Sequence, residues 1–189
     1  IRWNFFMLRV SACTLKHREE ITCLSVDEIM TSDVLTLQAD EPIFKGLALM
    51  AEHNIRHVPV VNKLHLLKGI VSHRDILRAN LSSLSNEELK SRADIETIPI
   101  ESIMSKHVCA ASPKDSLLSV GRILQREKFG CVPIVDDGIL VGIVTDTDYV
   151  SVAITLIEAM EDFEDAVEDG DIEAPEEEDI LLAESLDSL

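Results

Sequence analysis

The sequence lacks the patterns that mark most catalytic and metal-binding proteins. Its 4 cysteines form no CxxC pair, and its 6 histidines form no HExxH motif and no i, i+4 pair on one helix. Gly69 and Gly142 are single glycines rather than parts of a Gly-rich phosphate loop. No nucleophile stands in a recognisable pattern with a base. We therefore expect no catalytic residue, no metal site and no required cofactor.

Long apolar runs and clusters of cations are also absent. A transmembrane helix needs about 18 consecutive apolar residues, and a nucleic-acid binder needs a basic face. The sequence offers neither. Its net charge of −18 is concentrated at one end, because residues 158–189 contain fifteen acids and no Lys or Arg. The body is nearly neutral, so we expect partners other than nucleic acid or membrane.

The cysteines favour a reducing, cytoplasmic location. Cys109 and Cys131 each lie in an apolar, strand-like run, where a free thiol behaves as a small hydrophobic group. Residues 10–13 match a short lipoprotein cleavage pattern, but the apolar run before them is short and is followed by Arg9. We therefore do not expect a lipoprotein signal, and we predict that residues 1–24 are an N-terminal extension or the edge of a fragment.

Internal repetition is the strongest feature of the chain. Residues 26–30 (VDEIM) recur as 100–104 (IESIM), and residues 57–61 (HVPVV) recur as 131–135 (CVPIV). Residues 69–75 (GIVSHRD) recur as 142–148 (GIVTDTD). Three motifs in one order at near-constant spacing indicate a duplicated unit. Its boundaries are predicted at 25–81 and 99–160, joined by a linker at 82–98.

Each copy has the local pattern β-α-β-β-α. Short strands are predicted at 34–37 and 108–111, followed by helices capped at Asp40 and Ser112. The helices carry apolar residues at i, i+3, i+4 and i+7 and end at left-handed stops, Asn54 and Gly130. Residues 136–138 (DDG) predict a tight hairpin. A second helix opens at Ser72 or at Thr145.

The repeated motifs resemble a tandem pair of CBS domains, a Bateman module, over residues 25–160. The resemblance is to the stand-alone bacterial type. It implies an α/β (α+β) fold of two βαββα repeats, packed sheet to sheet with pseudo-two-fold symmetry. It further implies a regulatory, energy-sensing homodimer that binds AMP, ADP, ATP or a related adenosyl ligand.

The resemblance places ribose and phosphate contacts on the repeated Ser/Thr-x-x-Asp element. These residues are Ser72 and Asp75 in one site, and Thr145 and Asp148 in the other. A carboxylate can accept hydrogen bonds from ribose hydroxyls, and a helix start favours an anion. The alternative is a plain helix cap, in which the acid folds back on its own helix start.

The two sites are expected to differ in charge. The expected phosphate position of the first site is surrounded by Arg56, His57, His73 and Arg74. The guanidinium of Arg74 can donate two parallel hydrogen bonds to a polyphosphate. The second site is expected to hold Gly130, Cys131, Asp146 and Thr147, with Asp146 repelling phosphate. Possible adenine contacts, which core packing would explain equally well, are Leu37, Val58, Pro59, Val132 and Pro133.

The C-terminal segment, 161–189, is predicted to be an acidic helix and tail, partly disordered. An apolar stripe at Val152, Leu156, Met160, Phe163 and Val167 favours a core-packing or dimer-facing helix. The tail could dock on a protein partner or compete as an anion for the first site. Two functions remain open: an adenine-nucleotide sensor that signals to a protein effector, and a ligand-free dimerisation scaffold whose acidic tail recruits a partner. A detached regulatory piece of a larger enzyme or transporter is a third interpretation.

Overall fold

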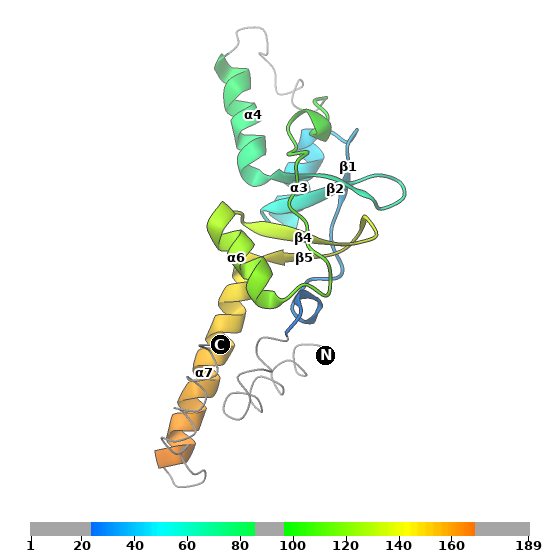
Figure 1. The fold of residues 1–189 in the computed structure, drawn as a ribbon. Coiled ribbons are helices and arrows are strands. Elements are labelled where there is room, and N and C mark those ends of the chain that lie inside the picture. Colours follow the sequence, from blue (N-terminus) through cyan, green and yellow to red (C-terminus); the bar gives the residue numbers. More distant parts are fainter. Residues whose placement is uncertain (1–23, 86–96, 169–189) are drawn as a thin grey trace. The chain divides into compact units, whose positions relative to one another are not determined.

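The computed structural model describes residues 24–85 and 97–168 (Figure 1). One compact unit, Ser25–Asp146, contains most of both repeats, and the described part of the other comprises Leu24 and residues 147–168. The predicted N-terminal extension up to residue 23, most of the linker and the acidic tail lie outside the described residues. Within the described ranges, no helix is long and apolar enough to span a membrane.

The first repeat builds a three-stranded sheet in the order β1-β2-β3. Strand β1 pairs parallel with β2, which pairs antiparallel with β3. Its elements are η1 (Val26–Glu28), β1 (Leu37–Gln38), α3 (Ile43–Glu52), β2 (His57–Val61), β3 (Leu67–Ser72) and α4 (His73–Ser85).

The second repeat follows the same order with a shorter first strand. Its elements are η2 (Ile100–Ser102), α6 (Leu117–Glu127), β4 (Cys131–Asp136), β5 (Ile139–Thr145) and α7 (Asp146–Glu168). Strands β4 and β5 are antiparallel, and Ala111 makes a single parallel bridge to Ile134 where the first repeat has β1. The mixed α+β duplication predicted from the sequence is therefore confirmed, whereas the two leading strands are shorter than expected.

The predicted helix caps are wrong by a few residues. Ser112 and Asp115 form a turn before the helix, in which the N–H of Ser112 donates to Oδ2 of Asp115 (2.8 Å). The cap of α6 is Ser116, whose hydroxyl accepts from the N–H of Ser119 (3.2 Å). Helix α3 begins after Pro42, without a side-chain cap from Asp40. In each repeat a turn intervenes between strand and helix, and it uses the polar residues that the sequence had suggested for the cap.

The predicted buried helix faces are confirmed. Helix α3 buries Ile43, Gly46 and Met50, and α6 buries Leu117, Val120 and Leu124. In the first repeat this face packs into a core cluster of fully or nearly fully buried residues: Leu37, Ile43, Met50, Val58, Val60, Val71, Ile76 and Ile100. Ile100 belongs to the second repeat, so the core of one repeat is completed by the other.

The two helix stops differ from the prediction in one case. Asn54 adopts the left-handed conformation (φ 53°), as predicted, but the second stop is Lys128 (φ 55°) rather than Gly130. The β4–β5 hairpin turns at Asp137 (φ 48°) and Gly138 (φ 81°), which is the pair of positive φ angles that a tight two-residue hairpin needs.

The two repeats exchange their leading segments. The segment after η2 lies along β3, where Ile70 and Ser105 exchange backbone hydrogen bonds of 3.0 and 2.9 Å. The segment after η1 lies along β5, where Thr31 and Ile143 form the equivalent pair at 3.0 Å in both directions. The two pairs correspond under the 74- and 73-residue offsets of the repeat. The exchange therefore follows a pseudo-two-fold relation between the repeats.

The hairpins also meet across this relation. The N–H of Leu67 donates to the carbonyl of Gly138 (3.2 Å), and the N–H of Leu140 donates to the carbonyl of His65 (3.0 Å). The strands of the two repeats are thus joined through backbone hydrogen bonds at their hairpin ends.

The repeated glycine of the GIV motif makes room for the exchanged segment. A Cβ at Gly69 would lie 2.7 Å from Sδ of Met104 and 2.9 Å from the carbonyl oxygen of Ser105. A Cβ at Gly142 would lie 2.4 Å from Sδ of Met30. The glycine and methionine motifs recur together because each glycine packs against the methionine of the opposite repeat.

Helix α7 continues without a break to Glu168. Val152 and Thr155 are buried, whereas Met160 is 54% exposed. Met160 therefore does not pack into the core of this chain, and the dimer-facing alternative for the apolar stripe stays a prediction. The side chains of Phe163 and Val167 lie outside the described part of the chain.

The glycine contacts predict different outcomes for two alanine substitutions. Gly142→Ala should lose about 1–3 kcal/mol of stability through overpacking, and adding Met30→Ala should recover part of that loss because the clash is with a side chain. Met104→Ala should recover less of the stability lost in Gly69→Ala, because the added Cβ would still clash with the carbonyl oxygen of Ser105. Urea unfolding of the single and double variants measures both couplings. Equal recovery in the two pairs would contradict this account.

Candidate ligand-binding cavity

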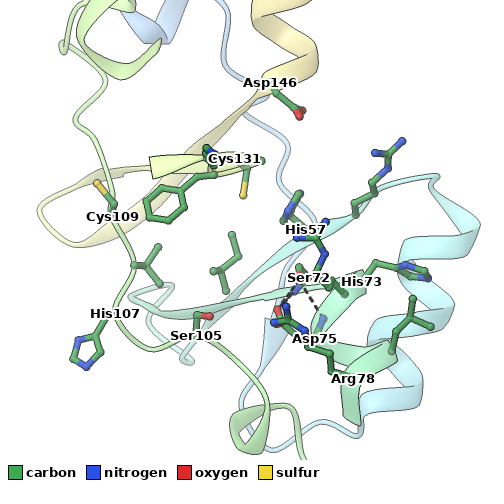
Figure 2. Close-up of a pocket in the computed structure, with 18 residues that line it drawn as sticks. His57, Ser72, His73, Asp75, Arg78, Ser105, His107, Cys109, Cys131 and Asp146 are labelled. Carbon is green, nitrogen blue, oxygen red and sulfur yellow. Dashed lines mark hydrogen bonds between the residues drawn. The ribbon is translucent and has the colours of Figure 1, made fainter. Parts of the chain in front are cut away.

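A cavity of about 740 Å³ opens between the two repeats. The first repeat contributes the start of β2, the end of β3 and the first two turns of α4, and the second contributes the segment after η2 and the α6–β4 loop. Its lining residues are Arg56, His57, Ile70, Ser72, His73, Arg74, Asp75, Leu77, Arg78, Ser105, His107, Val108, Cys109, Lys128, Phe129, Gly130, Cys131 and Asp146. In Figure 2, Ser72 and Asp75 lie across the cavity from Cys109 and Cys131.

Ser72 and Asp75 form a reciprocal cap at the start of α4. Oδ2 of Asp75 accepts from the N–H (2.9 Å) and the hydroxyl (2.6 Å) of Ser72, and the N–H of Asp75 donates to Oγ of Ser72 (3.3 Å). The capping alternative is thus realised in the structure, and the cavity lies directly beside it (Figure 2). Oδ1 of Asp75 makes no hydrogen bond among the described residues, so one carboxylate oxygen can still accept.

Six predicted contact residues of the first site line the cavity together: Arg56, His57, Ser72, His73, Arg74 and Asp75. Two lining cations were not predicted from the sequence: Arg78, which follows Arg74 by four residues on α4, and Lys128, which lies in the other repeat. The i, i+4 spacing could have revealed Arg78. No sequence signal places Lys128 here, because its position depends on how the repeats pack.

The cavity lining carries more fixed positive charge than negative. Its cations are Arg56, Arg74, Arg78 and Lys128, whereas its carboxylates are Asp75 and Asp146. An apolar wall completes the lining, formed by Ile70, Leu77, Val108 and Phe129. A cavity with these two surfaces suits a ligand that has an anionic part and an apolar part.

His57 bridges the repeats at the edge of the cavity. A Cβ at Gly130 would lie 2.4 Å from Cε1 of His57, so only glycine leaves room for the imidazole ring. Burial lowers the pKa of His57, against the opposing charges of Asp146 and Asp75, while Arg56 and Arg74 add to the lowering. Gly130 was predicted to be a helix stop, but its role is to accommodate this ring.

The two described cysteines differ in exposure to solvent. Cys131 is buried in β4, where burial and the charge of Asp146 raise the pKa of its thiol to about 12. Cys109 is exposed and lies in a segment without strand structure, so the prediction of a buried strand thiol is wrong for this residue. Both thiols line the cavity.

The residues predicted as possible adenine contacts lie elsewhere. Leu37, Val58, Pro59, Val132 and Pro133 are all buried, and none belongs to the cavity lining. The exchange of segments explains the difference. The wall facing Ser72 is residues 105–109 from the opposite repeat, not the strand after Met30 in the same repeat.

The residues predicted for the second site fall into two groups. Gly130, Cys131 and Asp146 line the same cavity as Ser72 and Arg74, because the α6–β4 loop faces the first repeat. Thr145 ends β5, and Asp148 lies in the first turn of α7, in the other compact unit. Neither residue lines the cavity described here.

The CBS domain family matches the chain at residues 26–82 and 100–155, the two segments that form this cavity. The chain belongs to the CBS domain family. The match confirms the resemblance drawn from the repeated motifs and the tandem arrangement of two CBS repeats. Proteins of this family are generally regulatory. Among the described residues, no group of three or more His, Cys, Asp or Glu side chains is arranged to hold a metal ion.

Two solved structures are similar in fold and sequence. A protein assigned to acetoin utilization, AcuB from Vibrio cholerae, is 36% identical with a TM-score of 0.64, over 74% of this chain and 96% of its own. The CBS domain pair of protein MJ0100 is 27% identical with a TM-score of 0.58, over 69% of this chain and 95% of its own. That pair was solved in complex with 5′-methylthioadenosine and S-adenosyl-L-methionine.

The chain spans less than half of the curated relatives that it matches first. Protein MJ1225 of Methanocaldococcus jannaschii is 30% identical over 125 residues, which are 66% of this chain and 41% of that protein. A homoserine O-acetyltransferase of Methanococcus vannielii is 31% identical over 121 residues, which are 64% of this chain and 23% of the enzyme.

The lowered pKa of His57 predicts a pH-dependent stability. Below its ordinary pKa of 6.5, the unfolded chain binds this proton more readily than the folded protein does. The free energy of unfolding should therefore fall as the pH drops from about 7.5 through 6.5. Urea unfolding of His57→Gln should show a weaker fall over this range, whereas His53→Gln, an exposed control, should behave as the parent. The same slope in His57→Gln would contradict the assignment.

The cap at the start of α4 predicts a measurable loss on truncation. Asp75→Ala removes the acceptor of both Ser72 hydrogen bonds and should cost about 1 kcal/mol of stability. Asp33→Ala, at an exposed position outside the helices and strands, is the matched control and should be nearly neutral. Thermal unfolding at fixed pH compares the two, and equal stabilities would show that the cap does not form.

Proposed function

We propose that this chain is a non-catalytic regulatory module that binds an adenine nucleotide between its two CBS repeats and signals to a protein partner. The observation that carries the proposal is the cavity itself, where four cations and an apolar wall surround the start of α4. Both repeats line it, so a ligand there would bear on the joint between them.

The cavity offers a complementary group for each part of a nucleotide. Oδ1 of Asp75 can accept from a ribose hydroxyl while Oδ2 keeps its hydrogen bonds to Ser72. The N-terminus of α4 and the guanidinium of Arg74 favour phosphate oxygens. The apolar wall then remains for the base. Capping and ligand binding are therefore compatible uses of the same aspartate.

The relatives support an adenosyl ligand, and the charges favour a phosphorylated one. The MJ0100 pair holds adenosyl compounds, which supports the same class here. S-Adenosylmethionine carries a cationic sulfonium, and the cations of this cavity would disfavour it. AMP, ADP and ATP are therefore the proposed ligands.

The absence of catalysis is part of the proposal. The homoserine O-acetyltransferase match covers 23% of that enzyme, which a shared regulatory segment would explain. Assembly as a homodimer and signalling to an unidentified protein effector are further proposals from the family resemblance. A cytoplasmic location accords with the exposed, free thiol of Cys109.

A ligand-free scaffold is the competing function. The closed cap between Ser72 and Asp75 favours it, because both residues have a structural role without any ligand. In that case the two repeats would serve only in dimerisation, and the acidic tail would recruit the partner.

Calorimetry with AMP, ADP, ATP and S-adenosylmethionine separates the two functions. A sensor should bind at least one phosphorylated nucleotide and bind S-adenosylmethionine more weakly. Arg74→Ala should weaken ATP more than adenosine, because only ATP presents phosphate to the guanidinium. Arg122→Ala, an exposed arginine of α6 outside the cavity lining, is the matched control. No heat with any ligand would support the scaffold, and equal losses for ATP and adenosine would contradict the role of Arg74.

A further inference from the structure

The loop between α6 and β4 places two unusual residues in the cavity lining. Lys128 and Phe129 directly follow the last residue of α6 and line the cavity together with residues from the start of α4. Phe129 is 42% exposed, and among the described residues it is the only Phe, Tyr or Trp that lines this cavity. Neither residue is part of the repeated motifs, so neither is explained by the duplication.

The backbone of Lys128 indicates that its side chain matters. Its φ and ψ are 55° and 38°, in the left-handed region, and its N–H donates to the carbonyl of Leu124. Glycine or asparagine adopts this conformation at lower cost, and the first repeat has Asn54 at the corresponding position with φ 53°. A lysine at this stop is a local disadvantage for the backbone. Its ammonium group, which joins the cations of the cavity, offers a compensating role.

Phe129 offers a flat apolar face to a cavity whose other apolar residues, Ile70, Leu77 and Val108, are aliphatic. Stacking against another ring removes the exposed face of a phenylalanine from water, which is favourable. Any nucleobase can stack in this way, because every base has a flat π-face. The corresponding residue of the first repeat is Ile55, which does not line the cavity. Ring and cation therefore stand together only on the second repeat's loop.

We propose that Phe129 stacks on the base of the bound ligand and that Lys128 pairs with its phosphate. This assignment rests on the proposed function and deepens it, since it makes the loop the specificity-determining part of the cavity. The first repeat holds the ribose at Ser72 and Asp75 and contacts the phosphate through Arg74, and the second repeat contacts the base through Phe129 and the phosphate through Lys128. A ligand would then be held by both repeats at once.

Three ligands separate the two contacts: AMP, adenosine, which lacks the phosphate, and ribose 5-phosphate, which lacks the base. Phe129→Leu should weaken AMP and adenosine by roughly fivefold or more and leave ribose 5-phosphate unchanged. Lys128→Asn keeps the backbone preference seen at Asn54 and should weaken AMP and ribose 5-phosphate by roughly threefold, with adenosine unchanged. Calorimetry on the full chain gives the dissociation constant of each of the three ligands for the parent, for Phe129→Leu and for Lys128→Asn.

Matched controls exclude a general effect of substitution. Phe44→Leu changes an exposed phenylalanine of α3, and Lys63→Asn changes an exposed lysine in the β2–β3 turn; neither residue lines the cavity. Both should bind all three ligands as the parent does. Parent-like AMP binding by Phe129→Leu, or equal losses of AMP and ribose 5-phosphate, would overturn the stacking assignment while leaving the proposed function in place. If the parent chain binds none of the three ligands and neither ADP nor ATP, the proposed function fails, and this assignment fails with it.

Discussion

The exchange of leading segments between the repeats is the interaction on which the rest of the structure depends. A unit of about 50 residues buries too little apolar surface to be stable by itself. Here Ile100, from the second repeat, lies fully buried in the core of the first. The backbone pairs between Ile70 and Ser105, and between Thr31 and Ile143, hold the exchanged segments in register. The first repeat lacks a complete core without Ile100, and each repeat pairs a strand edge with a segment of the other.

The cavity is a consequence of that exchange. The segment that pairs with β3 continues past Ser105 to Cys109, and it forms the wall opposite the cap of α4. A ligand in the cavity would therefore touch the same segment that joins the repeats. This arrangement provides a physical route from ligand binding to a change in the joint, because the Gly69–Met104 contact lies one residue from Ser105.

The duplication is symmetric in its backbone and asymmetric in its side chains. Where the first repeat has Arg56 and His57, the second has Gly130 and Cys131, and the imidazole of His57 fits against Gly130. Where the first repeat ends its helix with Asn54, the second uses Lys128. Divergence of this kind leaves the hydrogen-bonded frame intact, since the frame uses backbone groups. It changes only the chemistry of the surface that a ligand would meet.

Much of the fold could be predicted from the sequence, because repeated motifs and helical periodicity are local properties. The buried faces of α3 and α6, the DDG hairpin and the stop at Asn54 were all predicted from neighbouring residues alone. So was the grouping of Arg56, His57, Ser72, His73, Arg74 and Asp75, since these residues belong to one strand pair and one helix start. The tertiary structure alone decided which repeat supplies the opposite wall. Residues 105–109, Lys128 and Phe129 reach the cavity through packing between segments far apart in the chain, and no local pattern records that packing.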